Sequence, residues 1–199
     1  VAIEIEPVVL DLLGRIQDDL ERGRGGRAGR WVRREAIHLT LKFLGDVPEE
    51  KLEDVYDAVD QACEGCRSFV MDVAGTGCFP NARRPRVIWV GVQEETGQLG
   101  ALQQAIEEEL GRLGFEKERR RFTPHLTLAR VHRRAERTDV DSLGRAVAEY
   151  GTGNAAHMEV RRVSVIRSDL RPTGAVYTEL HAVPLGESSE DQTESGDAP

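Results

Sequence analysis

The stretches IHLTLKFLG (residues 37–45) and PHLTLARV (residues 124–131) share the four-residue core His-Leu-Thr-Leu. Polar and apolar residues alternate in both, as they do in a β-strand with one buried face. Each histidine should therefore share a face with the threonine two positions later, about 6.6 Å away along the strand, while the leucines point to the core. The sequence thus predicts two strands that each offer one imidazole and one hydroxyl to a common phosphate-sized group.

The composition is that of a protein with one packed domain. The chain has 199 residues, of which 39% are hydrophobic, and this is enough to form a sizeable core. It has no run of roughly 18 consecutive apolar residues and no basic segment followed by an apolar one at its start, which predicts a soluble protein without a membrane span or signal peptide. The three cysteines are too few for a disulfide framework, and this scarcity favours the cytoplasm.

Charge is distributed unevenly along the chain. The net charge is −8, but residues 186–199 are rich in acids and contain no base, so we expect a disordered acidic tail there. The basic residues are mostly arginines in clusters, several of which flank the two His-Leu-Thr-Leu stretches. Clustered arginines can bind an anion locally even in an acidic protein, whereas the overall charge argues against a large nonspecific nucleic-acid surface.

Hydrophobic periodicity predicts a mixture of helices and strands. Helices are predicted over residues 7–22, 48–62, 96–113 and 140–150. Strands are predicted over residues 1–5, 31–33, 37–45, 68–74, 86–92, 124–131, 158–168 and 175–183. The glycine-rich residues 23–29 should form a flexible loop, and residues 76–85 should connect two strands. This order predicts an α+β fold with mostly antiparallel pairing.

The two His-Leu-Thr-Leu copies are separated by nearly half the chain, and each precedes a helix and then a pair of strands. We therefore expect residues 1–185 to form a single bilobal domain. Its two pseudo-symmetric lobes should have helices on the outside and face each other across a groove that both copies line. Residues 186–199 would lie outside this domain.

Two imidazoles on opposite sides of one phosphorus atom would supply the chemistry of phosphodiester cleavage. Histidine has a pKa of about 6.5, so one ring can be neutral and the other protonated at working pH. The neutral ring can take a proton from the attacking water or hydroxyl, while the protonated ring gives one to the leaving oxygen. We therefore predict His38 and His125 as catalytic residues, with donors for the phosphate oxygens at Thr40, Thr127 and Arg130.

Two other interpretations of these histidines are open. A single histidine in such a strand is more often structural or solvent-facing than catalytic. Paired histidines can also bind zinc, but zinc commonly takes a third protein ligand, and neither copy has a nearby His, Cys or acid aligned with its face. The occurrence of the same motif twice in one chain favours catalysis over both, so we expect no metal and no cofactor.

The sequence resembles the 2H phosphoesterase superfamily and, within it, the bacterial RNA 2′,3′-cyclic phosphodiesterases, also called LigT-like 2′-5′ RNA ligases. The matching segments are HLTLKFLGDVP, FPNARRPRVIWVGV, RFTPHLTLARV and SDLRPTGAVYTEL. The resemblance implies a bilobal α+β fold and metal-independent hydrolysis of an RNA 2′,3′-cyclic phosphate to a 2′-phosphomonoester with release of the 3′-hydroxyl.

The resemblance also implies roles for individual residues. His38 would be the proton donor to the 3′-oxygen, and His125 would be the proton acceptor that activates water. Phe43 and the guanidinium of Arg130 would stack on the terminal base, as aromatic and arginine planes do with unpaired RNA bases. Strict alternation puts Phe43 on the leucine face, so a core position is the alternative for it. The phosphate would be held by Thr40, Thr127 and Arg130.

Alternative functions share the same groove. The reverse reaction would join a 2′,3′-cyclic end to a 5′-hydroxyl as a 2′-5′ RNA ligase does, because the same acid and base serve both directions. A noncatalytic RNA-end-binding module is a third possibility, although binding alone would not need two proton-transfer groups. In each case the expected partners are RNA 3′ ends or nucleotides with a 2′,3′-cyclic phosphate, bound by a monomer without membrane contact.

Overall fold

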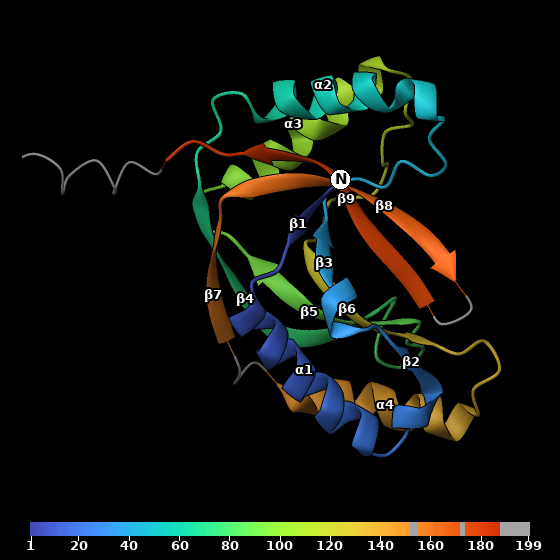
Figure 1. The fold of residues 1–199 in the computed structure, drawn as a ribbon. Helices are drawn as coiled ribbons and strands as arrows, with labels where there is room; N and C mark the ends of the chain where they lie inside the picture. Colours follow the sequence, from blue (N-terminus) through green and yellow to red (C-terminus); the bar gives the residue numbers. More distant parts are fainter. Residues whose placement is uncertain (152–154, 172–173, 188–199) are drawn as a thin grey trace, which may run out of the picture.

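The computed structural model describes residues 1–151, 155–171 and 174–187, and Figure 1 shows how they are arranged. The strands are β1 (Ala2–Glu4), β2 (Gly29–Trp31), β3 (His38–Thr40), β4 (Phe69–Phe79), β5 (Val87–Gln93), β6 (His125–Val131), β7 (Ala155–Val160), β8 (Arg162–Arg171) and β9 (Gly174–Pro184). The helices are α1 (Pro7–Arg22), α2 (Leu52–Cys63), α3 (Gln98–Arg112) and α4 (Arg137–Tyr150). Short 3₁₀ turns are η1 (Gly26–Ala28), η2 (Arg34–Ala36) and η3 (Glu49–Lys51). Within these ranges no helix is long and apolar enough to cross a membrane.

The strands form one antiparallel sheet that curls into a half-barrel (Figure 1). Its order is β7-β4-β5-β6-β3-β1-β8-β9, and β2 pairs with β6 outside this path. Every pair of named strands is antiparallel. The predicted α+β class with antiparallel pairing is therefore confirmed.

The two lobes meet at the centre of this sheet, where β3 lies beside β6. One lobe contains β7-β4-β5-β6 and the other β3-β1-β8-β9. Helices α1 and α4 pack together at one end of the molecule, and α2 and α3 pack together at the other (Figure 1). Each lobe thus combines strands from early and late parts of the chain, and backbone hydrogen bonds between β3 and β6 join the two lobes.

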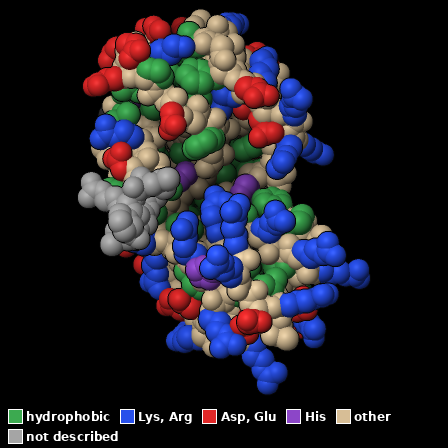
Figure 2. Space-filling view, turned by 90° about the vertical axis from the view of Figure 1, so that its right-hand side faces the viewer, with side chains coloured by type: hydrophobic (Ala, Val, Ile, Leu, Met, Phe, Trp, Pro, Cys, Tyr) green, Lys and Arg blue, Asp and Glu red, His purple; other side chains and the backbone are tan. Residues whose placement is uncertain are grey.

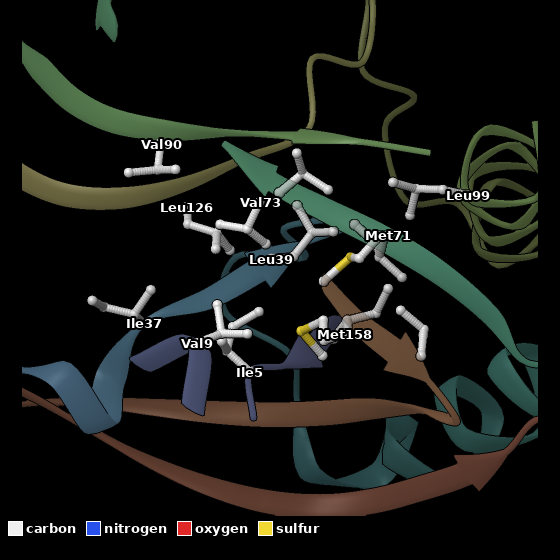
Figure 3. Packing of buried hydrophobic residues seen from close by; sticks show 14 of the residues in the cluster. Ile5, Val9, Ile37, Leu39, Met71, Val73, Val90, Leu99, Leu126 and Met158 are labelled. Carbon is white, nitrogen blue, oxygen red and sulfur yellow. The ribbon is translucent and has the colours of Figure 1, made fainter. Parts of the chain in front are cut away.

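The core lies between the sheet and the helices. The apolar stripe of α1 packs on the leucine face of the central strands, and Figure 3 shows Val9 and Leu39 among the buried residues of this layer. Leu39, Leu126 and Leu128 have no exposed surface. Burial of one such side chain contributes roughly 1.5–3 kcal/mol to stability. This burial holds the leucine face inward and therefore directs the histidine face outward.

The prediction of a flexible loop at residues 23–29 is wrong. This segment contains η1 and the first residue of β2, and both Gly26 and Ala28 are buried. Gly25 has a φ of 85°, and a Cβ on it would collide with the backbone of α4. The glycines therefore mark close packing and an unusual backbone conformation, which sequence alone does not distinguish from looseness.

Two strand boundaries also differ from the prediction. β4 continues to Phe79 through a register shift between Ala74 and Thr76, so the first part of the predicted connection, residues 76–79, is strand. The predicted strand at residues 158–168 is two strands, β7 and β8, which separate at Arg161. β7 pairs with β4, whereas β8 pairs with β1 and β9. Periodicity shows that a residue faces a core, but it does not show which neighbour the strand pairs with.

Backbone hydrogen bonds continue just past residue 185. The N–H of Gly186 donates to the carbonyl of Cys66, and the N–H of Ser68 donates to the carbonyl of Gly186. Most of the predicted acidic tail, residues 188–199, lies outside the described residues.

Candidate active site

The two His-Leu-Thr-Leu motifs lie on neighbouring strands. β3 and β6 pair antiparallel with Leu39 opposite Leu126. In this register His38 falls opposite Thr127, and Thr40 falls opposite His125. All four polar side chains therefore leave the same face of the sheet, while the two leucines leave the other.

This shared face carries a groove. Figure 2 shows a hollow near the middle of the molecular surface, with histidine side chains in it and Lys and Arg side chains gathered along one edge. Diagonal neighbours on an antiparallel pair are about 7–8 Å apart, and this is the relation of His38 to His125. The two imidazoles thus project side by side from this face, at a spacing that fits one phosphoryl group between them.

Each imidazole is oriented by the same kind of hydrogen bond. Nδ1 of His38 lies 3.0 Å from the carbonyl oxygen of Ala36, and Nδ1 of His125 lies 2.7 Å from that of Thr123. A carbonyl oxygen only accepts, so Nδ1 carries the proton and donates in both cases. Nε2 is then left free to accept or donate a proton in the groove. In both copies the carbonyl belongs to the residue two positions before the histidine, so the two halves repeat this local geometry.

Aromatic side chains pack edge-on against both imidazoles. Tyr177 meets His38 edge-on with ring centroids 5.0 Å apart, and Phe79 meets His125 edge-on at 4.9 Å. Trp89 packs on Phe79 at 5.1 Å and lies 6.4 Å from His125. Contacts of this geometry are favourable and limit rotation of the rings. Each histidine is therefore fixed by one hydrogen bond and by an aromatic neighbour on a different strand.

Burial shifts the pKa of one of the two histidines. The pKa of His38 is lowered from its ordinary value, chiefly because its partly buried position disfavours the charged ring. The hydrogen bond to the carbonyl of Ala36 opposes this effect, since it favours the protonated form. The free protein therefore holds His38 largely neutral at neutral pH, and an anion bound beside it would favour its protonation.

A β-bulge brings Arg130 to the histidine face. Trp89 of β5 pairs with Thr127, but the preceding Ile88 pairs with Ala129, so Leu128 is an extra residue in β6. Leu128 and Ala129 are consecutive and both fully buried. The side-chain alternation therefore shifts by one position, and Arg130 emerges on the same face as Thr127. Uniform alternation from His125 would have placed Arg130 on the leucine face.

Phe43 is a surface residue. Its side chain is 83% exposed, so the alternative core position is wrong. β3 ends at Thr40, and the next two residues, Leu41 and Lys42, both bond to the carbonyl of Val1 and are both buried. Alternation therefore stops before Phe43, which leaves the sheet and points to solvent. Thr40 is also exposed, and Thr127 is half-buried.

Sequence reasoning missed the aromatic residues of the groove. Phe79, Trp89 and Tyr177 lie within the segments FPNARRPRVIWVGV and SDLRPTGAVYTEL, but no pattern within those segments shows that they contact a histidine. One signal was present at Gly77, which lies opposite Trp89. A Cβ on Gly77 would collide with the indole ring, so this glycine makes room for Trp89 beside Phe79.

No metal-binding cluster of three or more His, Cys, Asp or Glu side chains occurs within residues 1–151, 155–171 and 174–187. The two motif histidines are each paired with a carbonyl and an aromatic ring instead. What the arrangement offers chemically is a pair of imidazoles, two hydroxyls and one guanidinium on a single face.

Comparison with known proteins identifies the family. The model of the family described as LigT like Phosphoesterase matches the chain twice, over residues 3–89 and 90–177. Each match contains one His-Leu-Thr-Leu motif, which agrees with an internal repeat.

Similar proteins share both the length and the fold. The RNA 2′,3′-cyclic phosphodiesterase of Methanothermobacter thermautotrophicus is 35% identical over 92% of this chain and 96% of its own length. The protein of the same name from Thermotoga maritima is 33% identical over 91% of each chain. A crystal structure of a Thermus thermophilus protein has a TM-score of 0.74 at 27% identity, covering 92% of this chain and 95% of the other. E. coli LigT complexed with 3′-AMP has a TM-score of 0.72 at 24% identity with the same coverage, a likeness of fold. This chain belongs to the LigT-like phosphoesterase family, within the 2H phosphoesterase superfamily.

Proposed function

We propose that this protein hydrolyses RNA 2′,3′-cyclic phosphate ends to 2′-phosphomonoesters by paired-histidine acid–base catalysis, without a metal ion. The relatives named RNA 2′,3′-cyclic phosphodiesterase support this substrate. The observation that carries the mechanism is the register of β3 on β6, which puts His38 and His125 on one face with both Nε2 atoms free.

The proposed reaction is a single displacement at phosphorus. Nε2 of neutral His125 takes a proton from water as the water oxygen forms a bond to phosphorus. The bond from phosphorus to the 3′-oxygen breaks, and Nε2 of protonated His38 gives its proton to that oxygen. The products are a 3′-hydroxyl and a 2′-phosphomonoester. His125 ends protonated and His38 neutral, and exchange with water restores both.

The remaining groove residues have supporting roles in this proposal. The hydroxyls of Thr40 and Thr127 and the guanidinium of Arg130 donate to the nonbridging oxygens, where negative charge accumulates. The exposed ring of Phe43 is available to stack on the terminal base, opposite the plane of Arg130. The three cysteines of the chain are free thiols, in keeping with action in the cytoplasm.

Product analysis tests the proposed function. The protein is incubated with an RNA ending in a 2′,3′-cyclic phosphate, with and without EDTA, and the product is separated from 2′- and 3′-phosphate standards. We expect only the 2′-phosphate and an equal rate in EDTA. A 3′-phosphate product would contradict the assigned leaving oxygen, and loss of activity in EDTA would contradict metal-independent catalysis.

The pH dependence tests the environment of His38. Rate should follow a bell-shaped curve in pH, with its maximum midway between the pKa values of the two imidazoles. Burial lowers the pKa of His38, and the ring of Tyr177 packs edge-on against this imidazole. Replacing Tyr177 with alanine admits water, raises the pKa of His38 toward its ordinary value and so moves the maximum of kcat/KM to higher pH. The maximum moves to higher pH whichever histidine is the acid, because it lies midway between the two pKa values.

The matched control is Tyr56→Ala, because Tyr56 stacks on His181 rather than on a motif histidine. Its pH maximum should equal that of the wild type. An unchanged or more acidic maximum in Tyr177→Ala would show that Tyr177 does not shield His38.

A further inference from the structure

A second arginine lies beside Arg130 on the groove face. β2 pairs antiparallel with β6, and Arg30 is directly opposite Arg130. We propose that Arg30, beside Arg130, binds the phosphodiester that precedes the terminal nucleotide, so that the preferred substrate is an RNA chain rather than a free cyclic nucleotide. This inference rests on the proposed function and extends it to a second phosphate.

The register fixes where this second phosphate would lie. Residues directly opposite each other on an antiparallel pair project from the same face, so Arg30 shares the face of Arg130 and, through the bulge, that of Thr127. Arg130 is about 10 Å along β6 from Thr127. β5 pairs with one side of β6, so β2 pairs with the other side, the side on which β3 also lies. Arg30 is therefore level with Arg130 along β6, past the two motifs, where a second phosphate of a longer substrate could reach it.

The charges of these two arginines are not compensated within the protein. Among the described residues neither Arg30 nor Arg130 forms an ion pair, although both are exposed. Their sequence neighbours differ, since Arg27 pairs with Asp139 at 2.7 Å and Arg34 pairs with Asp18 at 2.7 Å. Like charges directly opposite each other on a strand pair are destabilising. Phosphate groups bound beside these guanidinium groups would neutralise them and remove this repulsion.

The β1 side of His38 is mostly acidic, which disfavours an RNA backbone there. A cavity of about 590 Å³ beside His38 is also lined by Glu4, Glu179 and Arg162. Arg162 forms ion pairs with both glutamates, so its charge is neutralised within the protein. An RNA backbone is therefore favoured at the Arg30 end. Figure 2 agrees with this direction, since basic side chains gather along one edge of the hollow.

The test compares substrates of one and two nucleotides. kcat/KM is measured for adenosine 2′,3′-cyclic phosphate and for the adenosine dinucleotide with the same cyclic end, in the wild type and in Arg30→Gln. We expect the wild type to prefer the dinucleotide, and this preference to shrink as salt is raised. Arg30→Gln should lower kcat/KM for the dinucleotide about tenfold, as for loss of one charge-assisted hydrogen bond, and for the mononucleotide less than about twofold.

Binding and stability measurements make the test decisive. Affinity is measured for adenosine 2′-monophosphate and for the dinucleotide ending in a 2′-phosphate, so that the second phosphate is tested without turnover. Compared with the wild type, Arg30→Gln should bind the dinucleotide more weakly and adenosine 2′-monophosphate equally well. The Tm of this variant should equal or exceed that of the wild type, because a like-charge pair is removed. A purely structural role for Arg30 predicts a lower Tm instead.

Arg15→Gln is the matched control, because Arg15 is an exposed arginine on α1, which covers the opposite face of the sheet. It should leave all of these values unchanged. The inference is overturned if Arg30→Gln weakens both ligands equally or leaves the dinucleotide unaffected. If the wild type hydrolyses neither substrate, the proposed function fails, and the affinity comparison still decides whether the second phosphate is bound.

Discussion

Replacing either motif histidine is expected to lower kcat about 10²- to 10⁴-fold while the protein stays folded. Each imidazole would move one proton in the transition state, and a positioned general acid or base contributes a factor of this size. Alanine also removes the hydrogen bond from Nδ1, which costs about 1 kcal/mol of stability. Asparagine is the sharper variant, because its amide nitrogen can still donate to the carbonyl of Ala36 or Thr123 but has no group that titrates near neutrality.

We therefore expect His38→Asn and His125→Asn to be as inactive as the alanine variants and closer to the wild type in Tm. His132→Ala provides the matched control, since His132 follows β6 and is exposed. Activity is measured on a nucleoside 2′,3′-cyclic phosphate, with circular dichroism as the check on folding. Wild-type activity in either asparagine variant would show that the imidazole is structural and would refute the two-histidine mechanism.

The sequence predicts the histidine face of the groove because alternation within the motif determines which side chains share a face. Alternation in a half-buried strand assigns His38 and Thr40 to one face and Leu39 to the other, with no knowledge of the fold. Repetition of the motif indicated that two such faces belong together. The structure makes them neighbours in a single sheet, paired through Leu39 and Leu126. The two motifs thus form the floor of the groove side by side.

The elements that were misplaced depend on contacts between distant segments. The split between β7 and β8 follows from which strands they pair with, and pairing partners leave no periodic signal in one sequence. The rings of Phe79 and Tyr177 reach the two histidines from strands far away in the chain. Local patterns describe burial well, but these contacts exist only after the sheet has curled.

Arg130 shows how a local irregularity changes a functional assignment. Nothing in the letters LTLARV distinguishes a bulged strand from a regular one, and a regular strand would turn this side chain into the core. The pairing of β5 with β6 skips Leu128, and two successive buried residues then return Arg130 to the groove. The bulge therefore supplies the cation that the two histidines and two threonines lack.

Replacing Arg130 with alanine is expected to lower kcat about 10²- to 10³-fold, which corresponds to roughly 2.7–4 kcal/mol for one lost transition-state donor. The loss should be catalytic rather than structural, because Arg130 is exposed and faces Arg30, so its removal relieves a like-charge pair. Arg130→Lys should recover only part of the activity, since an ammonium keeps the charge but not the planar, bidentate fork that fits a phosphate.

The variants of Arg130 and Arg30 should differ in which substrate they affect. Arg130→Ala should lower kcat for the mononucleotide and for the dinucleotide alike, because it would act on the reacting phosphate, whereas Arg30→Gln should affect mainly the dinucleotide. Arg15→Ala serves as the control for loss of an exposed arginine on the other side of the sheet. If Arg130→Ala kept kcat within twofold of the wild type on the mononucleotide, the bulge would serve packing alone. The oxygens of the reacting phosphate would then depend on Thr40 and Thr127.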